Sequence, residues 1–137
     1  MRYTLLDNLR NEIILLARIL LMILFIMSGW SKLFGFGGTV AYLESLGTPV
    51  PMLAAAIAVL MEFFVAIAII LGFYTRPLAF LFALFALGTA LIGHDFWNMA
   101  DPERAANMTQ FFKNISIMGG LLLLGVTGAG KYSLDGR

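Results

Sequence analysis

Four long apolar segments alternate with shorter polar ones along this chain. A helix needs roughly 20 mostly apolar residues to cross about 30 Å of hydrocarbon, and each of these segments is close to that length. The pattern therefore predicts an all-α polytopic membrane protein, a four-transmembrane-helix bundle in which residues 1–137 form a single domain. The predicted spans are residues 13–31, 52–72, 77–93 and 111–127.

The connection between the second and third spans is the shortest. Only residues 73–76 separate the two segments, so these helices must form an antiparallel hairpin. Gly72 is suited to the C-cap of the first helix, and Pro77 is suited to the first helical position of the second.

The connection between the first and second spans predicts a helix of its own. Three glycines at positions 35, 37 and 38 loosen the chain, and Thr39 can then cap a short helix that ends at Leu46, before Gly47. Apolar residues recur along it at three-residue spacing, which favours a helix lying in the membrane interface. The alternative is an ordinary loop with one helical turn.

Composition narrows the functional classes. The chain is 61% hydrophobic and 12% charged, whereas soluble domains are about 45–50% apolar and about 25% charged. This excludes a disordered protein, a nucleic-acid binder and an ordinary soluble enzyme, and it makes the lipid bilayer the first partner. The absence of cysteine excludes disulfides, iron–sulfur clusters and thiolate zinc sites, and with one histidine we expect no metal site.

The distribution of basic residues predicts the orientation. Lysine and arginine accumulate in the cytoplasmic segments of membrane proteins. Five of them lie in the two tails and the tight second loop, and two lie in the other loops. We therefore expect a multi-pass protein of a bacterial inner membrane with both termini in the cytoplasm. The five are Arg2, Arg10, Arg76, Lys131 and Arg137, and the two are Lys32 and Arg104.

Ionisable residues inside the spans are candidates for function, because each costs about 2.5–3.5 kcal/mol at mid-helix. Arg18, Glu62 and the neutral Asn114 are predicted to form a buried polar core that could bind a ligand. Glu62 lies ten residues from either end of its span, on a stripe of alanines that lets another helix approach. Depth counting favours an Arg18–Glu62 ion pair. This pair either fixes helix packing, or Glu62 is protonated and serves a ligand or a proton.

A second polar group is predicted at the outer face. Lys32 ends the first span, His94 and Asp95 end the third, and Lys113 begins the fourth. His94 and Asp95 could handle a proton together, or His94 could simply be a polar cap. Lys113 is expected to extend outward or to meet Asp95. The two tryptophans of this face, Trp30 and Trp97, are typical of an interfacial belt.

The sequence resembles the DoxX family at several motifs. These are Phe25–Leu33 (FIMSGWSKL), Glu62, Leu71–Pro77 (LGFYTRP) and Ser133–Asp135 (SLD). Together with further matches such as Gly93-His94 and Phe96-Trp97, the likeness to small bacterial inner-membrane members covers nearly the whole chain. It implies a four-helix integral membrane protein. Because the family is linked to thiosulfate:quinone oxidoreduction and oxidative-stress complexes, it also implies a quinone as ligand and a redox partner in the membrane or periplasm.

Three functions stay open at this point. The chain is a subunit that binds a quinone or another apolar, lipid-like ligand, a carrier of a small solute or protons, or a scaffold whose polar residues only fix helix packing. A carrier would need a homo-oligomer, because four helices barely enclose a path. Whether the protein is an enzyme is not decided by these residues.

Overall fold

All four predicted spans are helices in the computed structural model, which describes residues 6–136. The described residues contain no strand, so the predicted all-α class is confirmed. Two short 3₁₀ turns accompany the helices. One, η1 (Asp7–Leu9), precedes helix α1, and the other, η3 (Phe96–Asn98), lies between helices α5 and α6. The helices are α1 (Arg10–Phe34), α2 (Phe36–Ser45), α3 (Pro51–Val59), α4 (Ala66–Leu71), α5 (Thr75–Gly93) and α6 (Glu103–Thr127), and the π-helical η2 (Leu60–Val65) joins α3 to α4.

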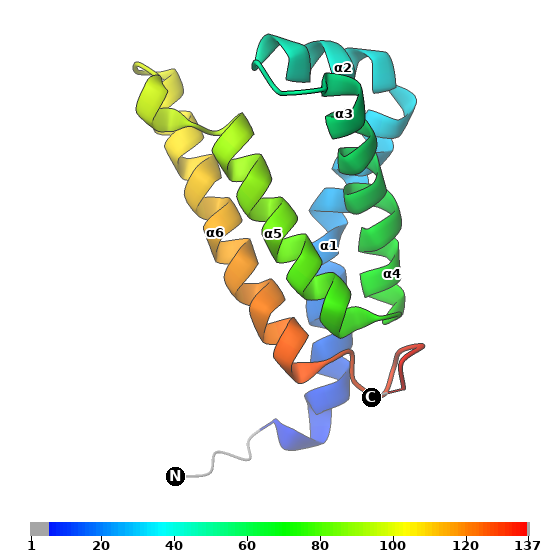
Figure 1. Cartoon of the computed structure of the whole chain (residues 1–137). Helices are drawn as coiled ribbons and strands as arrows, with labels where there is room; N and C mark the ends of the chain where they lie inside the picture. Colours follow the sequence, from blue (N-terminus) through cyan, green and yellow to red (C-terminus); the bar gives the residue numbers. More distant parts are fainter. Residues whose placement is uncertain (1–5, 137) are drawn as a thin grey trace.

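The helices form two pairs that diverge toward one end (Figure 1). One pair is α1 with the continuous α3–η2–α4 rod, and the other is α5 with α6, which pack along their lengths. Helix α2 lies across the end where the pairs diverge, here called the α2 end. The beginning of α1 and the C-terminal tail lie at the opposite end, here called the termini end. Arg2 and Arg137, which contributed to the predicted orientation, lie outside the described residues.

Helix boundaries differ from the predictions at two places. The fourth helix begins at Glu103 and not near residue 111, because its polar first turns are helical although they are not apolar. The short helix of the first connection is present, but it begins at Phe36, so Thr39 lies inside it and is not its cap. The Thr39 hydroxyl instead donates to the carbonyl of Gly35, one turn earlier. The prediction that the glycines loosen this segment was wrong for Gly37 and Gly38, which lie inside α2, whereas Gly35 separates α1 from α2.

The hairpin between α4 and α5 follows the prediction closely. Gly72 ends α4 with φ of 73°, a left-handed conformation that glycine adopts without strain. Pro77 is the third residue of α5 and not its first, because the helix already begins at Thr75. It still lies in the first turn, where its missing N–H leaves no hydrogen bond unmade.

The apolar core lies where the two helix pairs still touch. Phe25 of α1 meets Phe82 of α5 edge to face, with ring centroids 4.7 Å apart. Met22, Ile69 and Leu121 close around them and are fully buried. This core holds the pairs together below α2, and one space between them opens toward the α2 end. Another lies between α1 and α6, where Ile13 and Thr127 are among its lining residues.

A π-helical turn interrupts the second span at Glu62. Residues Leu60–Val65 adopt this geometry, which is rare and is found mostly as single turns at functional sites. Gly29 of α1 packs directly against the turn. A Cβ atom at Gly29 would lie 2.7 Å from the carbonyl carbon of Glu62 and from the amide nitrogen of Phe63. Glycine is therefore required for the close approach of α1 to Glu62.

Replacing Gly29 with alanine should separate these two helices. The added methyl group meets backbone atoms that cannot rotate away, so we expect a loss of about 1–3 kcal/mol in the free energy of unfolding. The thermal midpoint of the purified protein in detergent measures it. Gly119→Ala is the matched control, because nothing lies within 4 Å of its added methyl. Equal midpoints for the two variants would show that the close approach is absent.

Candidate ligand-binding site

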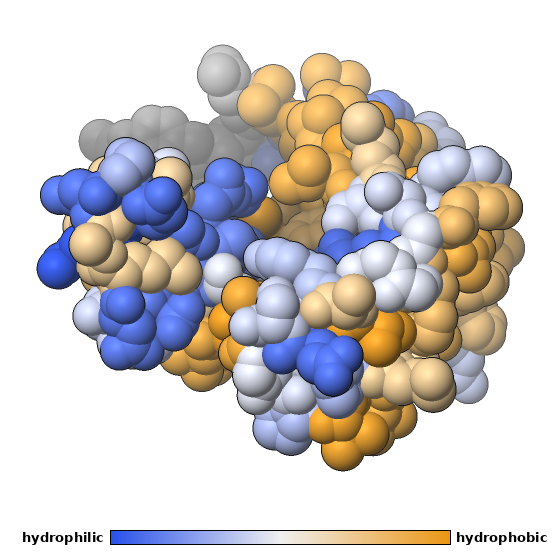
Figure 2. Space-filling view, turned by 90° about the horizontal axis from the view of Figure 1, so that it is seen from above, coloured by the Kyte–Doolittle hydropathy of each residue, from blue (hydrophilic) through white to orange (hydrophobic). Residues whose placement is uncertain are grey.

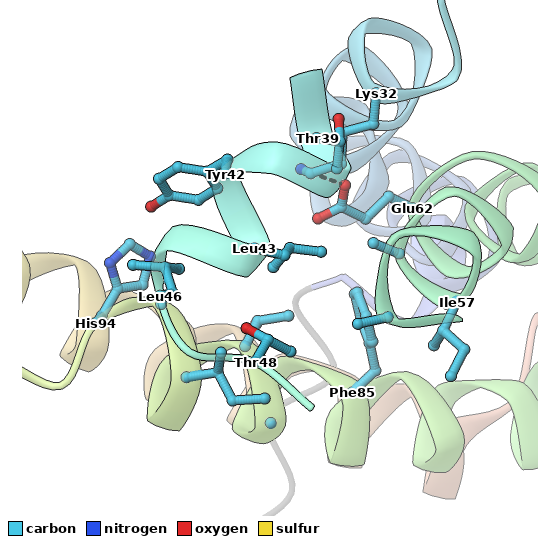
Figure 3. A pocket seen from close by; sticks show the side chains of 16 residues that line it. Lys32, Thr39, Tyr42, Leu43, Leu46, Thr48, Ile57, Glu62, Phe85 and His94 are labelled. Atoms are coloured by element: carbon cyan, nitrogen blue, oxygen red, sulfur yellow. Dashed lines mark hydrogen bonds and ion pairs between the residues drawn. The ribbon is translucent and has the colours of Figure 1, made fainter. Parts of the chain in front are cut away.

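A pocket of about 450 Å³ lies between the two helix pairs beneath α2 (Figure 3). Small-molecule sites commonly have volumes of about 300–1,000 Å³ and walls that are mostly apolar with a few polar groups. This pocket has that character. Its apolar walls come from α2, α3 and α5 and include Leu43, Leu46, Ile57, Phe85 and Ile92. The polar side chains that line it are Lys32, Thr39, Tyr42, Thr48, Glu62, Thr89 and His94.

Three polar side chains meet at one side of the pocket: Ser28 and Lys32 of α1 and Glu62 of η2, here called the polar triad. The ammonium of Lys32 lies 2.6 Å from Oε2 of Glu62 and donates to Oγ of Ser28, also at 2.6 Å. The Ser28 hydroxyl donates to the same carboxylate oxygen at 3.2 Å. Glu62 is 7% exposed, and its ion pair with Lys32 is drawn as a dashed line in Figure 3.

The polar triad retains unused hydrogen-bonding capacity. An ammonium has three N–H groups, and Lys32 uses one for Ser28 and one for Glu62. No hydrogen bond to Oε1 of Glu62 occurs among residues 6–136. Because both residues line the pocket, one donor and one acceptor remain for a bound molecule. The opposite charges also cancel, which lowers the energetic cost of placing them in an apolar environment.

The predicted Arg18–Glu62 ion pair was wrong. Gly29 faces Glu62, and Arg18 lies eleven residues before Gly29 on the same helix, a separation of about 16 Å along the helix axis. The predicted pair also rested on the depth of each residue along its helix and left out the direction of the side chains. Side chains tilt toward the N-terminus of their helix, so Lys32 on α1 and Glu62 on the antiparallel α3–η2–α4 rod tilt toward each other. Lys32 therefore belongs with Glu62.

Arg18 is completely buried near the termini end and holds backbone there. Its guanidinium donates to the carbonyl of Ile70 at 2.7 Å, to that of Ile69 at 3.4 Å, and to that of Tyr132. The first two carbonyls lie in the last turn of α4, where the i→i−4 pattern of the helix ends. That of Ile69 also accepts from the amide of Gly72 at 3.1 Å. Arg18 thus connects α1, α4 and the C-terminal tail, and it takes no part in the pocket.

The C-terminal tail supports this arrangement. The carboxylate of Asp135 accepts hydrogen bonds from the amides of Tyr74 and Thr75, each at 2.9 Å, and so caps the start of α5. Tyr132 donates to Glu12 at 3.1 Å, and this hydrogen bond is the main cause of the raised pKa of the Tyr132 phenol. The tail therefore ties the beginning of α1 to the α4–α5 hairpin.

Asn114 is buried, but it lies apart from both Arg18 and the polar triad. Its amide donates to the carbonyl of Ala86 at 3.2 Å and to the hydroxyl of Thr89 at 3.0 Å. Both partners lie on α5, and Thr89 lines the pocket. Asn114 therefore fixes one pocket wall from behind. The three residues of the predicted core are all buried, yet they occupy three separate places.

The remaining outer-face residues do not form one cluster. His94 lines the pocket, and its Nδ1 lies 2.9 Å from Oδ1 of Asn107 on α6. Asp95 instead accepts a hydrogen bond from Asn98, so no His94–Asp95 hydrogen bond forms in the described chain. Lys113 is exposed on α6, and the described residues include no ion pair between it and Asp95.

The two predicted interfacial tryptophans are half exposed at the same end of the bundle. Trp30 packs against Phe34 with the rings tilted and their centroids 4.5 Å apart, and Trp97 packs edge-on against Phe111 at 5.7 Å. Both positions fit the expected belt. Viewed from this end, the surface is hollowed near its centre, hydrophobic residues lie at the floor of the hollow, and hydrophilic ones gather over the α5–α6 connection (Figure 2).

Sequence reasoning missed Ser28 and Thr48. Ser28 precedes Lys32 by four residues, the spacing that places two side chains on one helical face. The sequence alone therefore indicates that Ser28 lies beside Lys32. Thr48 lies in the turn after α2, and nothing in its local sequence indicates burial. Only the folded chain brings it against α5 and into the pocket wall.

Comparison with known proteins places the chain in a family. The DoxX family model matches residues 13–95, which include the polar triad, Thr48 and His94. The inner membrane protein YphA of Escherichia coli K12 is 54% identical over 128 residues, covering 93% of this chain and 91% of YphA. The inner membrane protein YqjF of the same organism is 45% identical over 122 residues, covering 89% and 88% of the two chains. No solved structure matches at a significant level. The chain therefore belongs to the DoxX family of membrane proteins.

Proposed function

We propose that this protein binds a membrane-soluble molecule of the quinone class in the pocket beneath α2. The observation that carries the proposal is the polar triad, a neutralised ion pair with one spare donor and one spare acceptor in a mostly apolar cavity. The spare N–H of Lys32 suits a carbonyl oxygen. The unused Oε1 of Glu62 suits a hydroxyl hydrogen, so both an oxidised quinone and a reduced quinol find a partner.

The rest of the pocket fits the apolar part of such a molecule. Phe85 and the aliphatic side chains of α2 and α3 provide the walls. A ring and the beginning of a side chain fill a volume of this order.

The family supports the same chemistry. The resemblance to the DoxX family implies a quinone as ligand, and isoprenoid quinones dissolve in membranes such as the inner membrane that the names of YphA and YqjF give. We assign ligand binding to this chain. Electron transfer to a bound quinone would require a redox partner in the membrane or periplasm. That partner would act on a single copy of this chain or on a homo-oligomer of it.

Binding to the purified protein tests the proposal. We expect 2-methyl-1,4-naphthoquinone to bind the wild-type protein in detergent. We expect the Glu62→Gln and Lys32→Met variants to bind it about 10–100-fold more weakly, because a hydrogen bond to a charged group is worth about 1.5–3 kcal/mol. Lys113→Met is the matched control, since Lys113 is exposed and outside the pocket.

Mass spectrometry of an organic extract supplies a second reading. An isoprenoid quinone should accompany the wild-type protein and be depleted in the Glu62→Gln variant. Recovery of phospholipid alone, together with no binding of the naphthoquinone, would reject the quinone in favour of a lipid. Equal affinity in all four proteins would show that the polar triad is not the binding group.

A further inference from the structure

One buried hydroxyl in the pocket wall has no partner. Thr48 is 8% exposed, and its Oγ1 makes no hydrogen bond within residues 6–136. A buried polar group left in this state costs about 1–3 kcal/mol, and such groups are rare in native proteins. The backbone amide of Thr48 is satisfied by the carbonyl of Leu43, so the turn itself does not need the hydroxyl. The hydroxyl is therefore uncommitted, and a rotation about χ1 would present it to a molecule in the pocket, whose wall Thr48 helps to form.

His94 adds an acceptor to the same wall. The amide group of Asn107 donates to the carbonyl of Glu103, which leaves its Oδ1 as an acceptor for Nδ1–H of His94. In the neutral ring, Nε2 is then a bare acceptor, and no hydrogen bond to it occurs in the described part of the chain. Thr48 and His94 both line the pocket (Figure 3).

We propose that Thr48 and His94 form a second polar subsite, which binds the second oxygen of a ligand whose first oxygen is held by the polar triad. This inference rests on the proposed function. In Figure 3, Thr48 and His94 lie across the pocket from Lys32 and Glu62. A molecule between them with an oxygen at each end of a flat ring satisfies both sides, whereas a lipid with one polar head leaves the Thr48 hydroxyl unpaired.

The two subsites have matching chemistry. The polar triad offers one N–H and one carboxylate oxygen, and the second subsite offers one O–H and one imidazole nitrogen. Each side therefore has a donor for a carbonyl and an acceptor for a hydroxyl. A 1,4-dicarbonyl ring and its dihydroxy form are the ligand class that uses all four groups.

A pair of ligands and a pair of variants test the second subsite. The probes are 2-methyl-1,4-naphthoquinone and 2-methyl-1-tetralone, which lacks the second oxygen. Thr48→Val should weaken the naphthoquinone about 3–10-fold, the value of one neutral hydrogen bond, and leave the tetralone unchanged. Thr48→Ser should restore binding. Thr39→Val is the matched control, because Thr39 also lines the pocket but its hydroxyl is used by Gly35.

Protein stability gives a reading that needs no ligand. Valine has nearly the shape of threonine, so Thr48→Val removes an unpaired hydroxyl without leaving a cavity. We expect the thermal midpoint of the unliganded protein to hold or to rise by a few degrees. A fall of several degrees would show that the hydroxyl has a structural partner, and it would overturn the subsite.

The outcomes separate this inference from the proposed function. If the naphthoquinone binds and depends on Lys32 but weakens equally in Thr48→Val and Thr39→Val, the second subsite is refuted and the proposed function stands. If both ligands lose the same affinity in Thr48→Val, the second subsite is also refuted. If neither ligand binds the wild-type protein, both proposals fall.

Discussion

Replacing Arg18 with alanine should destabilise the protein more than any other single truncation at the termini end. The guanidinium is fully buried and donates to the carbonyls of Ile69, Ile70 and Tyr132. The carbonyl of Ile69 keeps the amide of Gly72 as a donor when the guanidinium is removed, so the loss is concentrated at Ile70 and Tyr132. Hydrogen bonds to charged groups contribute about 1.5–3 kcal/mol each, and the variant also leaves a large cavity. We expect a loss of about 3–5 kcal/mol in the free energy of unfolding.

Thermal unfolding in detergent measures this loss. Arg10→Ala is the matched control, because Arg10 is exposed in the first turn of the same helix. Arg18→Lys should recover only part of the stability, since an ammonium is a compact donor and does not match the planar fork of the guanidinium. An Arg18→Ala protein as stable as Arg10→Ala would contradict the role assigned to Arg18.

The second large effect is expected within the polar triad. Lys32→Met alone leaves the carboxylate of Glu62 buried without its counterion. Breaking a fully buried pair costs about 3–5 kcal/mol in the free energy of unfolding. We expect a smaller loss here, because the Lys32 side chain is 30% exposed. The double variant Lys32→Met, Glu62→Leu removes both charges. Because replacing a buried ion pair by apolar residues is often neutral, we expect its stability to return close to that of the wild type.

This double variant separates a structural role from a functional one. A scaffold needs only the packing, so the double variant would keep every property of the wild-type protein. The binding account predicts a well-folded protein that no longer binds the naphthoquinone. A stable double variant with unchanged quinone affinity would support the scaffold and reject the ligand site.

The apolar pattern was enough to predict most of the fold. Span number, helix class and the hairpin with Gly72 at its turn follow from hydropathy and local backbone preferences, which depend on neighbouring residues. The start of α6 was not predictable in this way, because hydropathy indicates where a helix crosses the membrane and not where it begins. The π-helical turn at Glu62 also has no signal that hydropathy detects, and its close contact with Gly29 joins residues far apart in the sequence.

The candidate site was predicted only in part. Glu62 and Lys32 were identified by their charge, but the wrong partner was assigned to Glu62. Counting residues from the span ends assumes that all helices start at the same depth and that side chains have no preferred direction. The close packing of Gly29 against Glu62 shows their true register. Thr48 could not be predicted, since its importance comes from an unpaired hydroxyl that exists only once α2 folds over the pocket.

A crystal structure of the protein with 2-bromo-3,5,6-trimethyl-1,4-benzoquinone tests the central claim most directly, because anomalous scattering from bromine locates the ring without ambiguity. We predict the ring beneath α2, with one oxygen within hydrogen-bond distance of Lys32 and the other facing Thr48. A pocket closed by side chains, or one occupied by an acyl chain while the bromine lies elsewhere, would contradict it.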